Sequence, residues 1–515
     1  MMKKRTYVRF FLLLFLLCTI FYPLMRMVCK INWNDFSKLM SSLSFRKALG
    51  NSVLVTCLST CLSVGIAYLL AYTIHRTNIK HKSFLKIVIP LPMLIPSISH
   101  GLGLMTLFGA NGIFSRSLGF NIVGFPGVVI GSILYSFPVA FLILSDGFSY
   151  MDNTMYEVSK ILGFSRWQTF KKVTFCYLKK PILSAIFAVF TLIFTDYGVP
   201  LAIGGKFNTL PVYLYKEVMG LLNFSSGTII SLFLLIPAFF SFLFDLLCKD
   251  YTTVSQKKYP LSKNKRRDRI LTLVTYGILL FVFLILGSFV YYAFIDNIVL
   301  HPTFSLTHFS YVFENHLLTY LGNSLWISLL VSIFGTIISY LIAYFTARDG
   351  GHKGMHILAI SSLAIPGMVL GLSYTVSFHN TYFYNTFLIL VIVNIVHFMA
   401  SAYLMAYNAL KKLNSNYEGI AKVCHIGTIH LLKDVLIPNT KKTIREMFSY
   451  FFINAMITIS AVAFLYNTKT MPLSILITNY EGNLMLAEAA IVSLILFIVN
   501  LVMKGIVSFL NRKEG

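Results

Sequence analysis

The chain has 515 residues, of which 57% are hydrophobic and only 12% are charged. Soluble domains carry roughly 25% charged residues, so this composition excludes an ordinary soluble protein of several domains. The formal net charge of +25 suits either a nucleic acid or an anionic membrane surface as partner, and the positions of the basic residues separate these two classes.

Twelve apolar stretches follow one another along the chain, and a helix needs about 20 such residues to cross a bilayer. The apolar residues run continuously instead of alternating with polar ones, which indicates helices. We therefore predict an all-α, polytopic membrane protein. Its predicted spans are 8–29, 49–74, 84–109, 124–147, 181–203 and 226–248, followed by 270–295, 320–346, 356–378, 383–408, 445–466 and 484–507.

The first span follows the basic start Met-Met-Lys-Lys-Arg, as a secretory signal peptide would. Its apolar stretch is long, however, and ends in Leu24-Met25-Arg26-Met27 with no small-residue cleavage site. An uncleaved first helix is therefore the prediction, with a removed signal peptide as the alternative.

Most of the 43 Lys and Arg residues fall in alternate loops, counted from a cytosolic N terminus. The loops 76–86, 160–180, 249–269 and 411–445 are basic, whereas 296–319 contains neither Lys nor Arg. This is the positive-inside bias of membrane proteins. It predicts cytosolic termini and membrane lipid as a partner, and it argues against nucleic-acid binding.

The two halves of the chain share a repeat. Short motifs recur at nearly the same separation: Gly50-Asn51-Ser52 as Gly322-Asn323-Ser324, Arg76 as Arg348, and Ile95-Pro96 as Ile365-Pro366. Six spans per half leave both halves facing the same way, related by an axis along the membrane normal. We predict two modules, 1–248 and 270–515, joined by a basic cytosolic linker at 249–269.

A long loop separates the fourth and fifth spans of each half, at 152–180 and at 411–444. The first loop contains Glu157, Gly163 six residues later, and Val173 three residues before Cys176. Glycine accepts the left-handed conformation that ends one helix before another begins. The next helix would carry an apolar stripe able to enter a groove of a soluble partner, made by Phe164, Trp167 and Phe170.

This pattern resembles the "EAA" loop of permeases from ATP-binding-cassette (ABC) importers, with Cys176 at the family's proline position. The second loop keeps Val435 and Pro438, but His425 stands where the pattern has glycine, and Glu418 is one residue out of register. For His425, a polar residue filling a helix break is favoured over a pH-sensitive or metal contact. The predicted second stripe is Ile426, Ile429, Leu432 and Val435. For both loops the alternative is an amphipathic helix resting on the membrane.

The resemblance implies a type I ABC importer permease in a prokaryotic inner membrane. Its implied partners are two ATPase subunits, docked on the two loops, and an extracytoplasmic solute-binding protein. The sequence lacks a Gly-x-x-x-x-Gly-Lys-Ser/Thr phosphate loop, so we expect ATP hydrolysis on a separate subunit and no enzymatic activity here. Seven cysteines without Cys-x-x-Cys spacing predict neither a metal site nor a cofactor.

Stretches around 195–227 and 458–487 resemble fused permeases for ferric iron and for 2-aminoethylphosphonate, and thiamine permeases share the fused architecture. Ferric iron is the favoured substrate. Candidate pathway residues are Asp196, a carboxylate at membrane depth, and the pair Asn394 and His397 on one helix face. An interfacial carboxylate in a turn is the alternative for Asp196, and helix-to-helix hydrogen bonding is the alternative for the pair.

Two other classes remain open. A secondary carrier also has twelve helices in two repeats, although loop 76–86 lacks the Gly-x-x-x-Asp-Arg/Lys motif of such carriers. A polytopic membrane enzyme would need a catalytic cluster, and the sequence shows none that we recognise.

Overall fold

The computed structural model describes residues 2–247, 264–296, 302–350 and 352–512. Most of the predicted linker therefore lies outside the described residues. The helices of the first half are α1 (Met2–Leu16), η1 (Leu17–Phe21), α2 (Tyr22–Val28), α3 (Trp33–Ser41), α4 (Leu43–Arg76), α5 (Lys82–Val88), η2 (Leu91–Leu94), α6 (Ser97–Phe108), α7 (Ile113–Leu118), α8 (Phe125–Ser149), α9 (Thr154–Ile161), α10 (Arg166–Thr169), η3 (Phe170–Thr174), α11 (Phe175–Phe194), α12 (Gly198–Ile203), α13 (Leu210–Tyr215), η4 (Lys216–Gly220) and α14 (Phe224–Leu247).

The second half follows the same order. It contains α15 (Lys265–Phe294), the short antiparallel strands β1 (Ile295–Asp296) and β2 (Thr303–Phe304), α16 (Thr307–Glu314), α17 (Leu317–Ala347), α18 (Lys353–Ser361), η5 (Ser362–Ala364), α19 (Gly367–Phe378), α20 (Phe387–Lys412), α21 (Asn416–Val423), α22 (Thr428–His430), η6 (Leu431–Leu436), α23 (Ile437–Ile457), α24 (Leu473–Gly482) and α25 (Leu486–Arg512).

The predicted all-α membrane fold is confirmed. Among the described residues, nine helices are long and apolar enough to cross a membrane, or eleven if two bent helix pairs each count as one span. The remaining predicted span corresponds to α23, whose first half carries Lys441, Lys442, Arg445 and Glu446.

Both bent pairs occur where the repeat places a proline. The chain turns by 93° between 82–94 and 97–115, and by 107° between 353–364 and 367–378. Pro96 and Pro366 directly precede α6 and α19. Proline disfavours helical backbone in the residue before it, and Ile95 and Ile365 accordingly have extended backbones. The predicted spans 84–109 and 356–378 are therefore broken helices.

Other boundaries differ from the prediction. Instead of one span at 181–203, a continuous helix runs from Arg166 to Phe194, and α12 follows after a break. The predicted span 445–466 is replaced by α23, after which the backbone is mostly irregular up to α24. Residues 265–269 were assigned to the linker, but they form the first turns of α15.

The first helix of each half packs against the other half. Helix α1 contacts α17, and α15 contacts both α4 and α6. Arg9 of α1 forms an ion pair with Asp349, just beyond α17, and its guanidinium lies 5.3 Å from the Phe345 ring centroid. The two repeats are thereby fastened to each other at the ends of their long helices.

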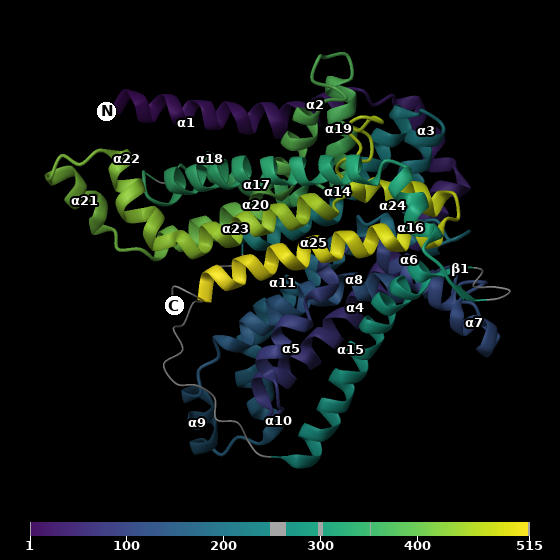
Figure 1. The fold of residues 1–515 in the computed structure, drawn as a ribbon. Helices are drawn as coiled ribbons and strands as arrows, with labels where there is room; N and C mark the ends of the chain where they lie inside the picture. Colours follow the sequence, from purple (N-terminus) through teal and green to yellow (C-terminus); the bar gives the residue numbers. More distant parts are fainter. Residues whose placement is uncertain (1, 248–263, 297–301, 351, 513–515) are drawn as a thin grey trace.

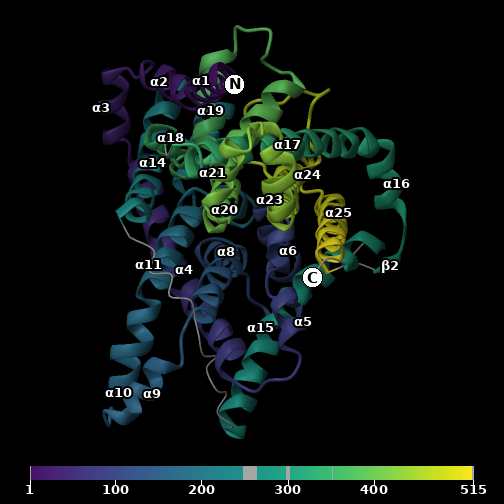
Figure 2. The same ribbon diagram turned by 90° about the vertical axis from the view of Figure 1, so that its left-hand side faces the viewer.

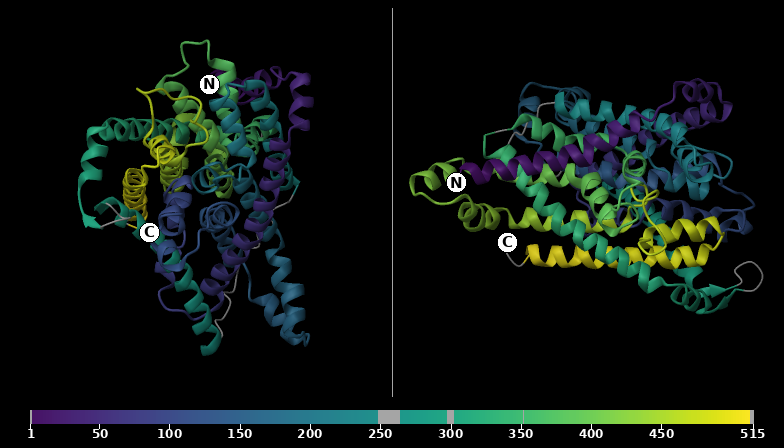
Figure 3. Two further views of the ribbon diagram at one scale, coloured as in Figure 1. Left: turned by 90° about the vertical axis from the view of Figure 1, so that its right-hand side faces the viewer. Right: turned by 90° about the horizontal axis from the view of Figure 1, so that it is seen from above.

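The long helices run side by side between two ends of the molecule (Figure 1). One end, which we call the loop end, carries the N terminus, the end of α25, and the short helices α9 and α21. The opposite end carries α3, α7, α16 and β1 (Figures 1 and 3). Large apolar side chains are exposed along the sides of these helices, for example Leu54, Phe240, Leu280 and Ile337. Such surfaces suit contact with lipid.

Candidate functional site

The two predicted coupling loops, one per repeat, lie at the loop end. Figure 2 views this end directly and shows α9 and α10 of the first loop well apart from α21 of the second. Each loop consists of a short helix, a sharp break, and a second helix that continues into the fifth helix of its repeat. The backbone of each loop is therefore continuous with a long helix, α11 or α23.

In the first loop, the predicted break occurs at Gly163. Its φ is 68°, a left-handed conformation that costs glycine little. The amide of Phe164 donates to the carbonyl oxygen of Ser159 at 2.9 Å, which closes the end of α9. The next helix starts with a capping box, in which the Ser165 side chain accepts from the Gln168 amide and the Gln168 side chain accepts from the Ser165 amide.

Part of the predicted apolar stripe is exposed on this second helix. Trp167 and Phe170 have 69% and 40% of their surface exposed, and their rings stack at a centroid distance of 5.7 Å. Phe164 is half-buried, and the Lys172 ammonium lies 4.6 Å from its ring centroid. Val173 faces the protein interior instead. The exposed surface is consequently a small aromatic ridge.

The second loop repeats this backbone with different side chains. His425 has a φ of 55°, so it occupies the left-handed position of Gly163. The amide of Ile426 donates to the Ala421 carbonyl oxygen at 2.8 Å, matching the bond that closes α9. In this register Glu418 lies opposite Tyr156 and not opposite Glu157, as the shifted sequence pattern predicted.

Local support is weaker in the second loop. The residue that precedes α22 is Gly427, and no side chain caps the helix there. Ile426 and Ile429 are exposed, Leu432 and Val435 are half-buried, and Pro438 is exposed in the first turn of α23. The stripe thus presents two isoleucines where the first loop presents two aromatic rings.

An arginine at the end of each repeat's longest helix holds the loop of that repeat. Arg348 follows α17, and its Nε and Nη2 donate to the two carboxylate oxygens of Glu418, both at 2.6 Å. Its guanidinium also donates to the carbonyl oxygens of Leu413 and Asn414, each at 2.7 Å. The Arg348 side chain is only 5% exposed. A bidentate pair of this kind fixes both distance and orientation.

Arg76 has the equivalent place at the end of α4. Its Nη2 donates to the Tyr156 hydroxyl at 3.2 Å, and its guanidinium lies 5.0 Å from the Tyr156 ring centroid. The Tyr156 hydroxyl also lies 2.9 Å from Thr174 Oγ1 in η3. Sequence comparison found both arginines as repeat markers but gave them no role. Aligning the two loops on their breaks would have placed Tyr156 and Glu418 opposite them.

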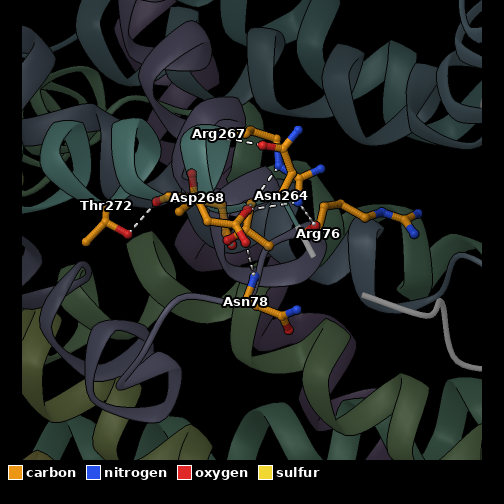
Figure 4. Close-up of polar contacts among 8 residues, drawn as sticks. Arg76, Asn78, Asn264, Arg267, Asp268 and Thr272 are labelled. Carbon is orange, nitrogen blue, oxygen red and sulfur yellow. Dashed lines mark hydrogen bonds and ion pairs between the residues drawn. The ribbon is translucent and has the colours of Figure 1, made fainter. Parts of the chain in front are cut away.

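The other repeat also reaches the Arg76 end of α4 (Figure 4). Arg267 of α15 donates to the Arg76 carbonyl oxygen at 3.4 Å, and the Asn78 amide donates to Asp268 Oδ2 at 3.4 Å. Arg267 and Asp268 are themselves ion-paired at 2.9 Å. Arg9 of the first repeat pairs in the same way with Asp349, just beyond α17. The end of α4 and the end of α17 are therefore each contacted by a residue of the opposite repeat.

The opposite ends of α4 and α17 are held by a second duplicated contact. Ser52 Oγ accepts from the Leu210 amide, and Ser324 Oγ accepts from the Leu473 amide, both at 2.6 Å. The neighbouring Asn51 and Asn323 donate to backbone carbonyls of Asn208 at 3.0 Å and Met471 at 3.2 Å. These bonds fasten each long helix to the segment that starts α13 or α24, which we call the outer segments.

The outer segments meet residues of both repeats. Tyr215 of α13 stacks on Tyr197 at 5.5 Å and approaches Phe464 of the second repeat at 6.2 Å, measured between ring centroids. Burial raises the pKa of Glu481 in α24 from 4.5 to about 7. Burial also raises the pKa of Tyr215, with a smaller contribution from the Glu481 charge. The outer segments therefore border the boundary between the repeats.

Two cavities, each of about 480 Å³, adjoin the outer segments. The first has three lysines in its lining, Lys47, Lys206 and Lys216, with Glu217 beside them. The second is lined by four tyrosines, Tyr311, Tyr320, Tyr466 and Tyr480, together with His316. The two cavities thus lie at equivalent places in the two repeats, but the side chains that line them differ.

Asp196 forms its hydrogen bonds with nearby residues. It lies in the break between α11 and α12, where its carboxylate accepts from the amides of Gly198 and Val199 at 3.3 and 3.1 Å and bonds the Ser97 side chain. The carboxylate therefore caps the N terminus of α12, where the helix dipole favours a negative charge. This geometry agrees with a carboxylate held in a short turn, which is part of the alternative for Asp196.

Asn394 and His397 lie on α20, where Asn394 is buried and His397 is half-buried. The Asn394 amide donates to the Leu390 carbonyl oxygen at 2.8 Å, while Asn394 Oδ1 and His397 Nδ1 have no hydrogen-bond partner among the described residues. Nε2 of His397 lies near Gly367, at the start of α19. The pair is thus beside the second broken helix, away from both loops. In the described part of the chain, no group of three or more His, Cys, Asp or Glu side chains is placed to hold a metal ion.

Known proteins match this architecture. The family model "Binding-protein-dependent transport system inner membrane component" matches residues 63–249 and 335–514, once in each half. The ferric transport system permease protein of Actinobacillus pleuropneumoniae is 25% identical over 443 residues, which are 80% of this chain and 63% of that protein. The match thus spans less than two thirds of that relative.

Two further relatives match larger or smaller parts of the chain. An Fe(3+)-transport system permease protein of Haemophilus influenzae is 21% identical over 478 residues, 90% of this chain and 89% of the relative. The molybdate/tungstate transport system permease protein of Methanocaldococcus jannaschii is 26% identical over 228 residues, 44% of this chain and 89% of the relative. The family model covers most of the chain in two copies. The chain therefore belongs to the family of binding-protein-dependent transport system inner membrane components.

Proposed function

We propose that this chain is the permease subunit of an ATP-driven importer and moves ferric iron delivered by an external binding protein. The modules 1–248 and 270–515 form the two sides of the pathway, joined by the linker 249–269. The chain itself does not hydrolyse ATP. Two separate ATPase subunits bind the two coupling loops, through Glu157 to Val173 in the first and Glu418 to Pro438 in the second.

One observation carries this proposal. Each repeat presents the same broken helix pair, with a left-handed residue at the break, at one end of the molecule. The exposed apolar side chains after each break suit insertion into a groove of a soluble partner. A membrane-surface helix would not need the same sharp break in both repeats.

The orientation follows from charge. The loop end carries the basic segments 76–86 and 160–180 and both termini, and we place it in the cytosol by the positive-inside rule. The opposite end, with its two cavities, then faces the binding protein. Asp196, Asn394 and His397 remain candidates for the pathway, and the capping role of Asp196 makes it the weakest of the three.

Ferric iron is supported by the transport function of the relatives that match most of the chain. The same architecture serves other solutes, since a molybdate/tungstate permease matches one module. Import of 2-aminoethylphosphonate or thiamine by the same machinery is the alternative. Loading the binding protein that co-purifies with this permease with each of these three ligands, and measuring affinity, decides among them.

Docking is tested with Gly163→Pro and Trp167→Asp. We expect both variants to insert into the membrane normally, to lose the co-purifying ATPase, and to lose uptake at least tenfold. Trp33→Asp is a matched control, because Trp33 is 76% exposed in α3 at the opposite end; it should keep the ATPase. Full ATPase retention and uptake in both loop variants would refute the docking role.

A secondary carrier is separated from this proposal by its energy source. Uptake into cells should stop when ATP is depleted and persist when the proton gradient is collapsed. The reverse pattern would show that transport is driven by an ion gradient and would overturn the importer proposal.

A further inference from the structure

We infer that α4 and α17 are rigid rods that connect each coupling loop to the outer segment of its own repeat, with Arg76, Arg348, Ser52 and Ser324 as the positioning residues at the rod ends. The inference rests on the proposed function, because the loops must be moved by an ATPase. It assigns the route by which that movement reaches the far side of the membrane.

The inner joints combine two strong contacts. Arg348 binds both oxygens of Glu418 and two further carbonyls of the second loop within 2.7 Å, so the loop cannot turn without moving the end of α17. Arg76 holds Tyr156 by a hydrogen bond and by its position over the ring. A cation at a helix C terminus is also favoured by the helix dipole, which keeps both guanidinium groups in place.

The rods are suited to transmit a displacement. Helix α4 has 34 residues and α17 has 31, and neither contains a proline. By contrast, α11, which continues from the first loop, contains Pro181 and begins next to a π-helical turn. Kinks occur at such positions. At 1.5 Å per residue, the distance from Ser52 to Arg76 is roughly 36 Å, enough to cross the membrane core.

The outer joints are short and buried. Ser52 and Ser324 are 2% exposed, and each accepts the first backbone amide of an outer segment at 2.6 Å. The asparagine preceding each serine adds a second bond to the same segment. A shift of the rod along or about its axis therefore moves α13 or α24 with it.

The moved segments lie where a passage between the repeats must open. Tyr215 of α13 faces Phe464 of the second repeat, and Glu481 of α24 is close enough to Tyr215 for its charge to act on that phenol. Pulling α13 and α24 apart separates these side chains. The contacts of Arg267 and Arg9 tie the end of each rod to the first helix of the opposite repeat, α15 or α1.

The test measures the far end directly and needs no transported solute. Spin labels at Leu221 and Leu484 report on the outer segments, because each residue closely follows an outer segment and is well exposed, at 70% and 79%. Their distance is measured in the complex with its ATPase subunits, without nucleotide and with ATP plus vanadate. The wild-type chain should show a nucleotide-dependent change.

Two variants break one rod at different ends. Arg348→Met removes the inner joint of α17 and Ser324→Ala removes its outer joint. Each should reduce the nucleotide-dependent population shift at least threefold, and Ser324→Ala, which lies far from the loop, should also keep ATP hydrolysis within twofold. The double variant should be no worse than Arg348→Met alone, since both changes act on the same rod. Combining Arg348→Met with Ser52→Ala, which acts on the other rod, should lower the response further. Lys353→Met, an exposed basic residue near Arg348, is the control.

Each failure has a distinct meaning. If no ATPase subunit binds the wild-type chain, the proposed function fails. If the ATPase binds and hydrolyses but the labels in both single variants move as in the wild type, or the wild-type labels do not move, the rods are not the route. Should Arg348→Met fail to fold, Ser324→Ala, which removes only one oxygen, still decides the matter.

Discussion

The two coupling loops have the same backbone but are stabilised in different ways. The first is supported from within, by glycine at the left-handed position and by the Ser165–Gln168 capping box. The second has histidine at that position and no side-chain cap. Its main support comes from the paired charges of Arg348 and Glu418, where the first loop has the neutral Tyr156 opposite Arg76.

This difference shows that a duplicated element can lose its local sequence pattern and keep its position. The bond from Ile426 to Ala421 has the same place as the bond from Phe164 to Ser159, although few side chains match. An ion pair to a neighbouring helix fixes the loop as a whole, so the local turn no longer has to be optimal. The predictions below are expected to break or sharpen this contrast.

The largest effect is expected from Glu418→Ala. It leaves the nearly buried Arg348 guanidinium without its carboxylate, which should destabilise the second loop by about 3 kcal/mol. Tyr156→Phe in the first loop removes one hydrogen bond to a charged group and should cost about 1.5 kcal/mol. Hydrogen exchange of 411–430 and of 152–165 measures both. Glu446→Ala, at an exposed carboxylate of α23, is the control; equal effects in the two loops would contradict the contrast.

Substituting the residue at the break should lower the stability of the first loop and raise that of the second. Gly163→Ala places a side chain at a φ of 68° with nothing within 4 Å of it, so the cost is that of the backbone alone, about 1 kcal/mol. His425→Gly should stabilise the second loop by a smaller amount. Hydrogen exchange of the amides around each break reports the change. A loss of protection in His425→Gly would show that the histidine makes a contact of its own.

Caps are expected to matter less. Ser165→Ala removes the capping box and should destabilise the start of α10 by about 1 kcal/mol, whereas Gly427→Ser should stabilise α22 by a few tenths. Limited proteolysis at Lys171 and at Lys433 compares the two helix starts. If Ser165→Ala leaves cleavage unchanged, the first loop does not depend on its local pattern.

A last, pH-dependent effect concerns the outer segments. Glu481 in α24 corresponds to Val218 near the end of the first outer segment, when both are counted from Leu473 and Leu210. Because burial raises the pKa of Glu481 from 4.5 to about 7, the folded protein holds a proton in this interval that the unfolded chain releases. Stability should therefore decrease as the pH rises from about 4.5 to 7. Melting temperatures measured across this range should show less slope in Glu481→Gln.

The sequence was sufficient for the all-α membrane fold and the repeat, because length and apolarity decide what can cross a bilayer, but it missed the breaks and several helix boundaries. It also gave the left-handed position of His425, which counting from Pro438 identifies. It could not give the partners of Arg76 and Arg348, since these lie on loops whose path is set by tertiary packing. The packing of α1 and α15 against the opposite repeat was likewise not predictable, because an apolar helix sequence does not indicate which other helix it packs against. Asp196 is a pathway candidate by sequence because it is a charged residue at membrane depth. Its role as a helix cap depends on the break between α11 and α12, which the periodicity of apolar residues does not show.

The charged first half of α23 has a consequence for how the protein is made. A segment that contains Lys441, Lys442, Arg445 and Glu446 is a poor candidate for independent entry into lipid during synthesis. It packs between α17, α20 and α25, of which the first two are synthesised earlier. Biogenesis of the second repeat should therefore be ordered, with α17 and α20 already inserted when α23 leaves the ribosome, and truncations that remove either helix should leave α23 outside the bilayer.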